Sequence, residues 1–263
     1  MSMIGKEVRL GQLFDQRSGN LVALAMDHGA PLGPVKGFED PRETLRASKA
    51  GKPDLVFMPR GAVKAVYPIL VKERIPFLLA LDTLNSRGPD QQRYIFADTV
   101  DSAVSFGAGG VSMHVLIGPE YTTEMTASLA SAAIRCDELG MPLMAIMYPE
   151  GDDCFNVERV KYAARLGAEL GADVVKTYYT GDKESFAEVV RCCPVPVLMS
   201  GGPKAKTEKD FLIQLKDVMA AGGRGAAVGR NVWQHEKPAA MLKAVRKIVH
   251  DGSSVEEALA ELT

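Results

Sequence analysis

The chain has 263 residues, which is enough for one (β/α)8 barrel or for two smaller domains. Hydrophobic residues make up 46% of it and charged residues 24%, with 25 glycines, a composition that excludes a disordered or fibrous chain. The formal net charge of -2 favours neither nucleic acid nor an acidic membrane surface as a partner, so local charges must bind any anionic ligand.

Signals for export, disulfides and metal binding are missing from the sequence. No apolar run reaches the length of about 18 residues that a membrane span requires, and MSMIGKEVRL lacks the order of a signal peptide. The four cysteines have no CxxC spacing, and the four histidines form no motif such as HExxH. We therefore expect a cytoplasmic protein that needs no metal and no cofactor.

Short apolar runs recur along the chain, and each is followed by a stretch with helical character. The runs are LVALAM (21–26), DLVFM (54–58), FLLAL (77–81), GVSMHV (110–115), PLMAIM (142–147), DVVK (173–176), PVLM (196–199) and GAAVG (225–229). Most are continuously apolar, as strands are when both faces are buried. They predict an α/β fold with one domain over residues 1–263, a (β/α)8 TIM barrel with residues 1–20 as an N-terminal cap. A doubly wound open sheet is the main alternative.

Amphipathic stretches between these runs fit helices that pack on a barrel. Examples are VERVKYAARLGAELGA and KDFLIQLKDVMAAGG, whose apolar residues recur at helical spacing. The closing SSVEEALAELT begins like an N-capped helix. No low-complexity linker or shift in composition indicates a second domain.

Polar residues follow the predicted strands at the end where β/α barrels carry their active sites. They are Asp27, His28 and Gly29 after the first strand, His114 on the fourth, Tyr148 after the fifth, Lys176 at the end of the sixth, Ser200, Gly201 and Gly202 after the seventh, and Gly229 and Arg230 after the eighth. These residues are predicted to face one mouth of the barrel.

Lys176 is the candidate nucleophile. Strand alternation after Asp173 points its side chain into the barrel, where an ammonium is poorly solvated. A lysine attacks a carbonyl only when neutral, and lowering its pKa from about 10.4 to about 7 corresponds to roughly 4–5 kcal/mol, which desolvation can supply. The alternative is a lysine that extends to solvent or pairs with a carboxylate.

Three further residues have both a chemical and a structural interpretation. Tyr148 can exchange a proton with a substrate hydroxyl next to a breaking carbon–carbon bond, or it can simply pack. Asp27 can act as acid or base during carbinolamine dehydration, or it can cap a turn. His28 can hold a substrate oxygen, although a histidine bonded to the backbone is more common.

Glycine-rich turns after the last two predicted strands indicate a phosphate site. SGGPK begins with Ser200, Gly201 and Gly202, and VGR ends with Gly229 and Arg230. Exposed backbone N–H groups in these turns, together with the forked donors of Arg230, are suited to a phosphate. Either turn alone would be a weak signal, but their occurrence after successive strands favours phosphate binding.

The sequence resembles the archaeal-type class I fructose-bisphosphate aldolase family, and within it the branch of 2-amino-3,7-dideoxy-D-threo-hept-6-ulosonate synthases. The resemblance covers nearly the whole chain. It is carried by AMDHGAPLGPVKG (25–37), HVLIGPE (114–120), CDELGMPLMAIMYPEG (136–151), AARLGAELGADVVKTYYTGDKESF (163–186), CPVPVLMSGGPK (193–204) and GAAVGRNVWQHEKP (225–238).

The resemblance implies a role for each candidate. Lys176 forms the Schiff base, Tyr148 is the proton donor and Asp27 is a further acid or base. The remaining candidates line the substrate and phosphate pocket: His28, Gly29, Ala30, Pro31, His114, Pro149 and Glu150 for the substrate, and the two glycine turns for phosphate. It further implies aromatic amino acid biosynthesis, from a deoxy-ketofructose phosphate and L-aspartate semialdehyde. Barrels of this kind commonly assemble, so we expect a homo-oligomer.

Two departures from the family pattern concern the substrate. Glu150 stands where the pattern often has arginine (YPRG), which replaces an anion-binding donor with a carboxylate. The region LLALDTLNSRGPD (78–90) lacks the expected run of small residues and contributes Asp82 instead. Arg60 and Arg87 are candidates to compensate for the missing arginine.

Several alternative functions remain open at this point. The first is a class I fructose-1,6-bisphosphate aldolase, which would use the same residues. A related thiolase lineage keeps the lysine of VVKTYY, but it should not need the tyrosine of MYPEG. A metal-dependent aldolase or isomerase and a non-catalytic sugar-phosphate-binding barrel complete the alternatives.

Overall fold

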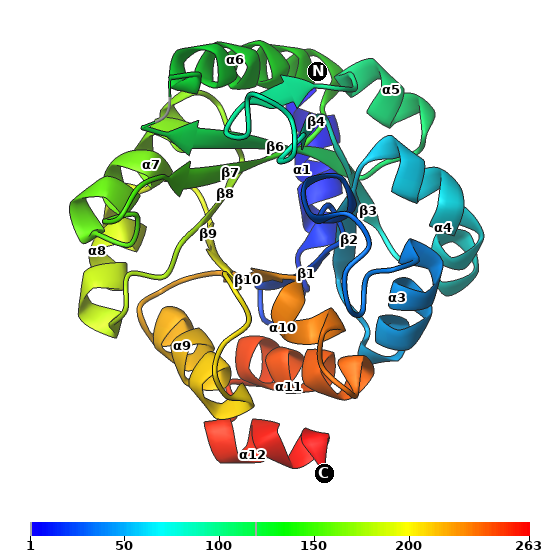
Figure 1. The fold of residues 1–263 in the computed structure, drawn as a ribbon, viewed down its shortest axis with the longest axis vertical. Helices are drawn as coiled ribbons and strands as arrows, with labels where there is room; N and C mark the ends of the chain where they lie inside the picture. The colour runs from blue at the N-terminus through cyan, green and yellow to red at the C-terminus, as the bar shows by residue number, and fades with distance from the viewer. Residues whose placement is uncertain (1, 119) are drawn as a thin grey trace.

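A computed structural model describes residues 2–118 and 120–263, which form a closed parallel barrel surrounded by helices (Figure 1). The barrel strands are β1 (Leu21–Ala25), β2 (Leu55–Met58), β3 (Phe77–Ala80), β6 (Gly110–Ile117), β7 (Leu143–Pro149), β8 (Val174–Thr177), β9 (Val197–Ser200) and β10 (Gly225–Val228). They follow one another around the ring in chain order, and β1 pairs with both β2 and β10. The predicted (β/α)8 barrel is confirmed, and the open-sheet alternative is wrong because no barrel strand is left at an edge.

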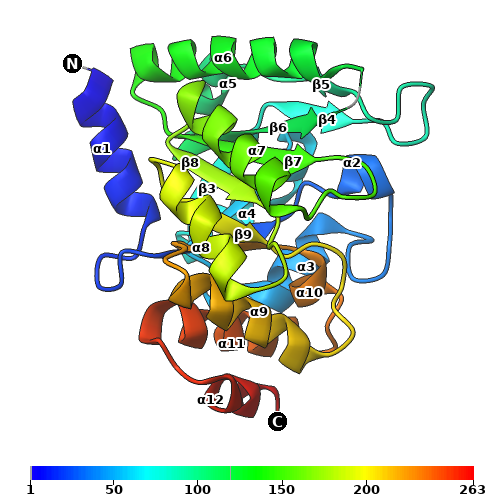
Figure 2. The ribbon, with the colours of Figure 1, turned by 90° about the vertical axis from the view of Figure 1, so that its left-hand side faces the viewer.

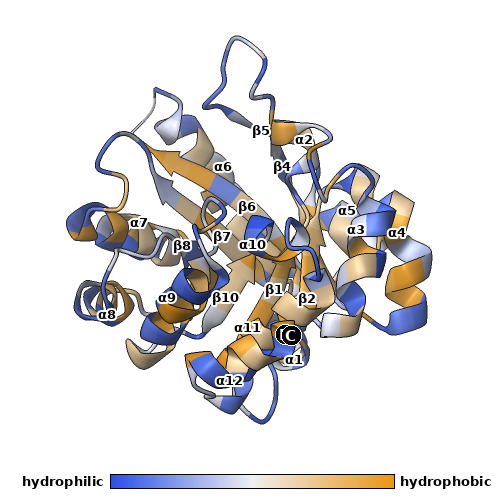
Figure 3. Ribbon diagram, turned by 60° about the horizontal axis from the view of Figure 1, so that its bottom comes forward, coloured by the Kyte–Doolittle hydropathy of each residue, from blue (hydrophilic) through white to orange (hydrophobic). Residues whose placement is uncertain are grey.

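A helix follows each barrel strand and covers the outside of the ring. These helices are α3 (Pro41–Ser48), α4 (Arg60–Glu73), α5 (Val100–Ser105), α6 (Thr122–Leu139), α7 (Val157–Glu169), α8 (Lys183–Cys192), α9 (Glu208–Ala220) and α11 (Pro238–Asp251). Side-chain caps fix where several begin, for example Asn156 before α7 and Thr207 before α9. Figure 3 shows mostly hydrophobic strands inside a ring of helices that alternate hydrophilic and hydrophobic stretches.

The strands bury two separate apolar layers because successive side chains point to opposite faces. One layer fills the barrel interior and includes Leu55, Phe57, Ile146 and Leu198. The other lies between the strands and the helices and includes Phe186. On each strand, the next inward-facing residue after the last apolar one therefore lies in the C-terminal mouth of the barrel.

Helix α1 (Ser2–Leu13) lies at the N-terminal end of the strands (Figure 2). Leu10, Leu13 and Phe14 pack against the first residues of the interior layer, including Leu21 and Leu55. This segment corresponds to the predicted cap over residues 1–20, of which Met1 lies outside the described residues. The open end of the barrel is therefore the opposite, C-terminal end of the strands.

Shorter elements complete the fold. They are α2 (Gly29–Leu32), α10 (Arg230–Trp233), α12 (Val255–Leu259), the 3-10 helices Lys49–Gly51 and Ala260–Leu262, and a hairpin of β4 (Asp82–Leu84) and β5 (Tyr94–Phe96). A capping box between Ser254 and Glu257 begins α12, as the sequence predicted. The hairpin was not predicted, because each of its strands has only three residues. No helix within residues 2–118 and 120–263 is both long and apolar enough to cross a bilayer.

Candidate active site

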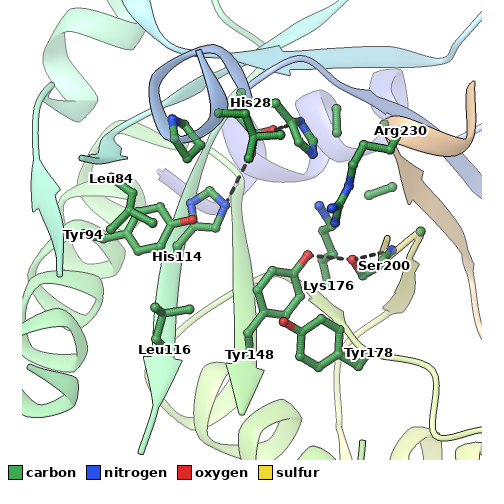
Figure 4. A pocket seen from close by; sticks show the side chains of 18 of the residues that line it. His28, Leu84, Tyr94, His114, Leu116, Tyr148, Lys176, Tyr178, Ser200 and Arg230 are labelled. Atoms are coloured by element: carbon green, nitrogen blue, oxygen red, sulfur yellow. Dashed lines mark hydrogen bonds and ion pairs between the residues drawn. The ribbon is translucent and has the colours of Figure 1, made fainter. Parts of the chain in front are cut away.

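A cavity of about 460 Å³ opens at the C-terminal mouth of the barrel. Its walls contain Asp27, His28, Asp82, His114, Tyr148, Glu150, Lys176, Tyr178, Ser200, Gly229 and Arg230. Figure 4 shows His28, His114, Tyr148, Lys176, Tyr178, Ser200 and Arg230 around this space. Several of these residues come two positions after an interior apolar residue: Asp27 after Ala25, Tyr148 after Ile146, Ser200 after Leu198 and Gly229 after Ala227. Strand alternation thus brings distant parts of the sequence into one layer.

The amine of Lys176 lies inside this cavity and is nearly shielded from water. Lys176 pairs in the sheet with Ile146 and Leu198, which both face the interior, and only 4% of it is exposed. Nζ lies 4.9 Å from the ring centre of Phe57 and 5.8 Å from that of Tyr148. Among the described residues, no carboxylate pairs with it within 4.0 Å, so the solvent-exposed and ion-paired interpretations do not hold.

This environment lowers the pKa of Lys176 to about 8. Burial is the largest cause, because it disfavours the charged amine. The negative charge of Asp27 opposes the shift, and the positive charge of Arg230 adds to it. A substantial fraction of the amine is therefore neutral near physiological pH, as nucleophilic attack on a carbonyl requires.

Tyr148 extends from β7 toward the same space. Its hydroxyl shares a 2.7 Å hydrogen bond with Oγ of Ser200, and its ring stacks on Tyr178 with centres 4.3 Å apart and an angle of 3° between the planes. Burial raises the pKa of Tyr148, against the hydrogen bond from Ser200 and the charge of Arg230. The phenol consequently keeps its proton at neutral pH and can donate it to a substrate oxygen.

Asp27 lies between two histidines. Its Oδ1 is 2.9 Å from Nδ1 of His28, an ion-pair contact without hydrogen-bond geometry, and its Oδ2 is 3.3 Å from Nε2 of His114. Burial alone would raise the pKa of Asp27, but contacts with His28 and His114 and the charge of Lys176 hold it well below its usual value. Asp27 is therefore a carboxylate at neutral pH.

His114 is held by a carboxylate on its other side. Oδ1 of Asp82 is 2.9 Å from Nδ1 of His114, and Oδ2 accepts the backbone N–H of His114 at 2.5 Å. The ring of Tyr94 stacks on the imidazole at 4.3 Å with an interplanar angle of 11°. Although burial lowers the pKa of His114, the charge of Asp82 and the contact with Asp27 raise it to about 9.

The opposite wall carries the features of an anion site. A Cβ added at Gly229 would lie 2.7 Å from Cε1 of His28, so only glycine fits there, and the adjacent Arg230 has a buried Nε without a partner among the described residues. Asn231 ties the two glycine turns together, because its Nδ2 donates to the carbonyl of Gly201 at 2.7 Å. The backbone at Gly202 has a φ of +59° with open space beside it.

Lys176 and Arg230 are the only lysine and arginine among the described residues that line the cavity. The other lining residues include Leu84, Leu116, Gln91, Gln92 and Glu150. The carboxylate of Glu150 is half-buried, and burial raises its pKa against the charge of Arg159. Neither Arg60, which pairs with Asp98, nor Arg87 lines the cavity, so neither compensates for Glu150.

The cavity brings together all the predicted site residues except three. Gly29 and Ala30 begin α2 and turn away to another face of the molecule, and Pro149 pairs with Ile117 and points out of the barrel interior. The structure does not bring these three residues into the cavity, and their assignment to substrate binding stays a prediction. Pro31 does line the cavity.

Sequence reasoning missed some residues of this site. Tyr178 was missed, and Asp82 was named without a place in the site. They lie two positions after Lys176 and Ala80, so strict strand alternation could have placed both. Tyr94 reaches the cavity only because the short β4–β5 hairpin folds back. Asn231 contributes by donating a hydrogen bond to the turn at Gly201, which is distant in the sequence. No local pattern marks the last two residues.

The chain matches a known enzyme family over most of its length. A model of the DeoC/LacD family of aldolases matches residues 21–235. The chain is 36% identical to the 2-amino-3,7-dideoxy-D-threo-hept-6-ulosonate synthase of Halobacterium salinarum over 262 residues, which cover 99% of this chain and 97% of that protein. It is also 36% identical to the class 1 fructose-bisphosphate aldolase of Thermoproteus tenax over 252 residues, covering 92% and 94% of the two chains.

Solved structures agree with this relationship. One is an archaeal fructose-1,6-bisphosphate aldolase in which the catalytic lysine is covalently bound to the carbinolamine intermediate of the substrate. The TM-score is 0.85 at 34% sequence identity, with 92% of this chain and 98% of that chain covered. The chain therefore belongs to the DeoC/LacD family of aldolases and is a class I, Schiff-base-forming aldolase.

Proposed function

We propose that the chain cleaves or transfers a carbon unit from a ketose with one phosphate group, through a Schiff base on Lys176. The observation that carries this proposal is the buried amine of Lys176, with a pKa of about 8, in a cavity that also contains Arg230 and two glycine turns. Amine attack on the ketose carbonyl leads to an iminium, and the iminium accepts the electrons of the breaking carbon–carbon bond.

Tyr148 moves the proton at the oxygen of the reacting aldehyde. In the condensation direction its phenol donates to the aldehyde oxygen, and in cleavage the phenolate takes that proton back. Ser200 and the charge of Arg230 stabilise the phenolate, since both act to lower the pKa of Tyr148. Protonation of the enamine gives aldolase turnover, whereas capture by a second aldehyde gives transfer.

The distribution of charge favours a monophosphate over a bisphosphate. Arg230 and the glycine turns suit one phosphate, while Glu150 would repel a second. This supports a synthase reaction, as in the name of the Halobacterium salinarum relative. The donor would then be a deoxy-ketofructose phosphate and the acceptor L-aspartate semialdehyde, as the resemblance of the sequence implies. The second candidate, fructose-1,6-bisphosphate aldolase, is favoured by the similarity to the Thermoproteus tenax enzyme.

Borohydride trapping with mass spectrometry tests the proposal. The chain is incubated with fructose 1-phosphate or with fructose 1,6-bisphosphate, reduced and digested. We expect the substrate mass on the peptide that contains Lys176, with more adduct from the monophosphate. Lys176→Met is the control without the amine, and the absence of an adduct from every ketose phosphate tried would overturn the proposal.

Two rival functions give different results in the same preparation. A metal-dependent aldolase would lose activity in chelator, whereas we expect full activity and an unchanged adduct. A non-catalytic barrel would bind sugar phosphates without any adduct or turnover.

The wider setting of the protein follows from the same proposal. We propose that residues 1–263 act as one domain and that the protein works in the cytoplasm, in the biosynthesis of aromatic amino acids. We also propose that it assembles as a homo-oligomer. Size-exclusion chromatography with light scattering tests the last of these. A monomer at micromolar concentration would contradict it.

A further inference from the structure

Three ionisable side chains, of which His114 and Asp82 are buried and Asp27 nearly so, form a continuous chain along one wall of the cavity. His114, visible in Figure 4, lies 3.3 Å from Asp27 through Nε2 and 2.9 Å from Asp82 through Nδ1. The exposed fractions of His114 and Asp82 are only 6% and 3%. Both ring nitrogens of His114 are thus occupied by carboxylates, and solvent hardly competes with these contacts.

The ring of His114 is fixed by two residues of the β4–β5 hairpin. Asp82 accepts both the backbone N–H and the ring Nδ1 of His114, and Tyr94 stacks on the ring face. Two carboxylates on opposite ring nitrogens favour the doubly protonated imidazolium, which directs its Nε2–H toward Asp27. This arrangement stores a proton next to a group that lines the cavity with Lys176.

Asp27 by itself does not supply that proton. Its pKa is held well below the usual value, so at neutral pH the group is an acceptor. Dehydration of a carbinolamine nevertheless needs an acid at the departing hydroxyl. His114 contacts Asp27 and can supply this proton, because its pKa is raised to about 9 and it stays protonated at neutral pH.

We propose that Asp82, His114 and Asp27 form a proton relay in which His114 is the acid for carbinolamine dehydration, Asp27 passes its proton to the substrate and Asp82 is a positioning residue. The inference rests on the proposed function, since the relay serves the Schiff base on Lys176. It assigns Asp82 a role and gives His114 a different role from the direct substrate contact predicted from the sequence.

The relay balances its atoms and charges within one turnover. As the carbinolamine C–O bond breaks, the nitrogen lone pair forms the C=N bond, and the hydroxyl leaves as water with the proton that Nε2 of His114 supplies through Asp27. Asp27 is a carboxylate before and after this step, and His114 becomes neutral. When water later adds to the iminium, its surplus proton returns through Asp27 to His114.

The described side chains that face His114 come from four parts of the fold. Asp82 comes from β4, Asp27 from the segment after β1, Tyr94 from β5 and Tyr148 from β7 with its ring centre 6.4 Å away. Burial raises the pKa of both tyrosines, so they remain neutral while His114 titrates. His28 and Lys176 both act on Asp27, whose pKa they help to lower.

The test is the pH dependence of iminium formation in full-length Asp82→Asn. Borohydride trapping is timed in a single turnover with saturating fructose 1-phosphate. In the wild type we expect the rate to fall above about pH 9. In Asp82→Asn we expect this fall to move down by about one pH unit or more, with a rate roughly tenfold or more lower near neutral pH.

Asp98→Asn is the matched control. Asp98 is also a buried carboxylate, but it pairs with Arg60 and does not line the cavity. We expect this variant to lose stability while it keeps the wild-type pH profile. His114→Gln should lower the rate by about 100-fold or more and remove the alkaline fall altogether.

A measurement on the wild type keeps the inference falsifiable even if Asp82→Asn fails to fold. NMR of the labelled His114 ring should show a titration midpoint well above neutral pH. A midpoint at or below neutral pH, or an unchanged alkaline fall in a folded Asp82→Asn, overturns the relay. If the wild type forms the borohydride-trapped adduct on Lys176, the proposed function stands even when the relay is wrong. If the wild type forms no adduct, the proposed function itself is overturned.

Discussion

Lys176 illustrates how burial creates a reactive group from an ordinary side chain. An amine among Phe57, Tyr148 and the barrel interior loses its hydration, and the pKa falls to about 8 although Asp27 acts against the change. The same lysine on the surface would be almost entirely protonated at neutral pH. The environment, and not the residue type, makes it a nucleophile.

The pH dependence of kcat/KM should report this amine. We expect kcat/KM for fructose 1-phosphate to rise about tenfold per pH unit below about pH 8 and then to level off up to about pH 9, because only the neutral amine attacks. Initial rates across this range give the midpoint. Lys176→Arg should show no activity at any pH, and a midpoint near that of a free lysine would contradict the buried geometry.

Tyr148→Phe should separate iminium formation from bond cleavage. Without the phenol, the adduct on Lys176 still forms, but carbon–carbon cleavage should slow by about 100-fold to 10,000-fold. Trapping and product release are measured on the same sample. Tyr162→Phe, at an exposed tyrosine of α7, is the control and should behave as the wild type. Equal losses in both steps would assign Tyr148 to packing.

Glu150→Arg should change the choice between phosphates. The variant exchanges a repelling carboxylate for a donor, so kcat/KM for fructose 1,6-bisphosphate relative to fructose 1-phosphate should rise roughly tenfold or more, about 1.4 kcal/mol. Steady-state kinetics with both sugars give the ratio. Asp152→Arg makes the same charge change at an exposed residue outside the cavity and should leave the ratio unaltered.

At the scale of elements, short strands position the site and the surrounding segments close it. Alternation along β7, β8 and β9 places Tyr148, Lys176 and Ser200 in one layer. The β4–β5 hairpin adds Asp82 and Tyr94, which hold His114 from two sides. Helix α1 covers the other end of the barrel and contributes packing but no cavity residue.

Leu13→Ala should therefore destabilise the fold without changing the chemistry. Leu13 is buried against the interior layer, and its truncation should lower the free energy of unfolding by about 2–5 kcal/mol. Val8→Ala changes an exposed residue of the same helix and should alter it by less than about 0.5 kcal/mol. Urea denaturation measures both, and a change in kcat of folded Leu13→Ala would link α1 to the active site.

At the scale of the whole molecule, the cavity groups should shape stability as a function of pH. His114 has a folded pKa of about 9 against 6.5 when unfolded, so its contribution is complete below pH 6.5 and is lost as pH rises to 9. Lys176 has a folded pKa of about 8 against 10.5, so it adds stability as pH rises from 8 to 10.5.

Urea midpoints should accordingly fall from about pH 6.5 to 8, change little up to about 9 and recover toward 10.5. The fall should disappear in His114→Gln, and the recovery should disappear in Lys176→Met. Stability that rises steadily between pH 6.5 and 8 would contradict the raised pKa of His114.

The sequence by itself determined the barrel and most of the candidate site. Eight buried strands require continuous apolar runs, and the mouth of a β/α barrel is where those runs end, so Lys176, Tyr148, Asp27 and Arg230 could be placed by counting along each run. The same patterns carried the resemblance to the aldolase family, which the comparisons confirm.

Only the tertiary structure decided which of these side chains touch. The contacts of Asp82 and Tyr94 with His114, and of Asn231 with the turn at Gly201, join segments far apart in the chain. Nor could the sequence show that Gly29, Ala30 and Pro149 turn away from the cavity. The pattern of apolar residues in the sequence reflects how each strand is buried. The distances between the strand ends, and the pKa values that depend on those distances, are set only when the barrel closes.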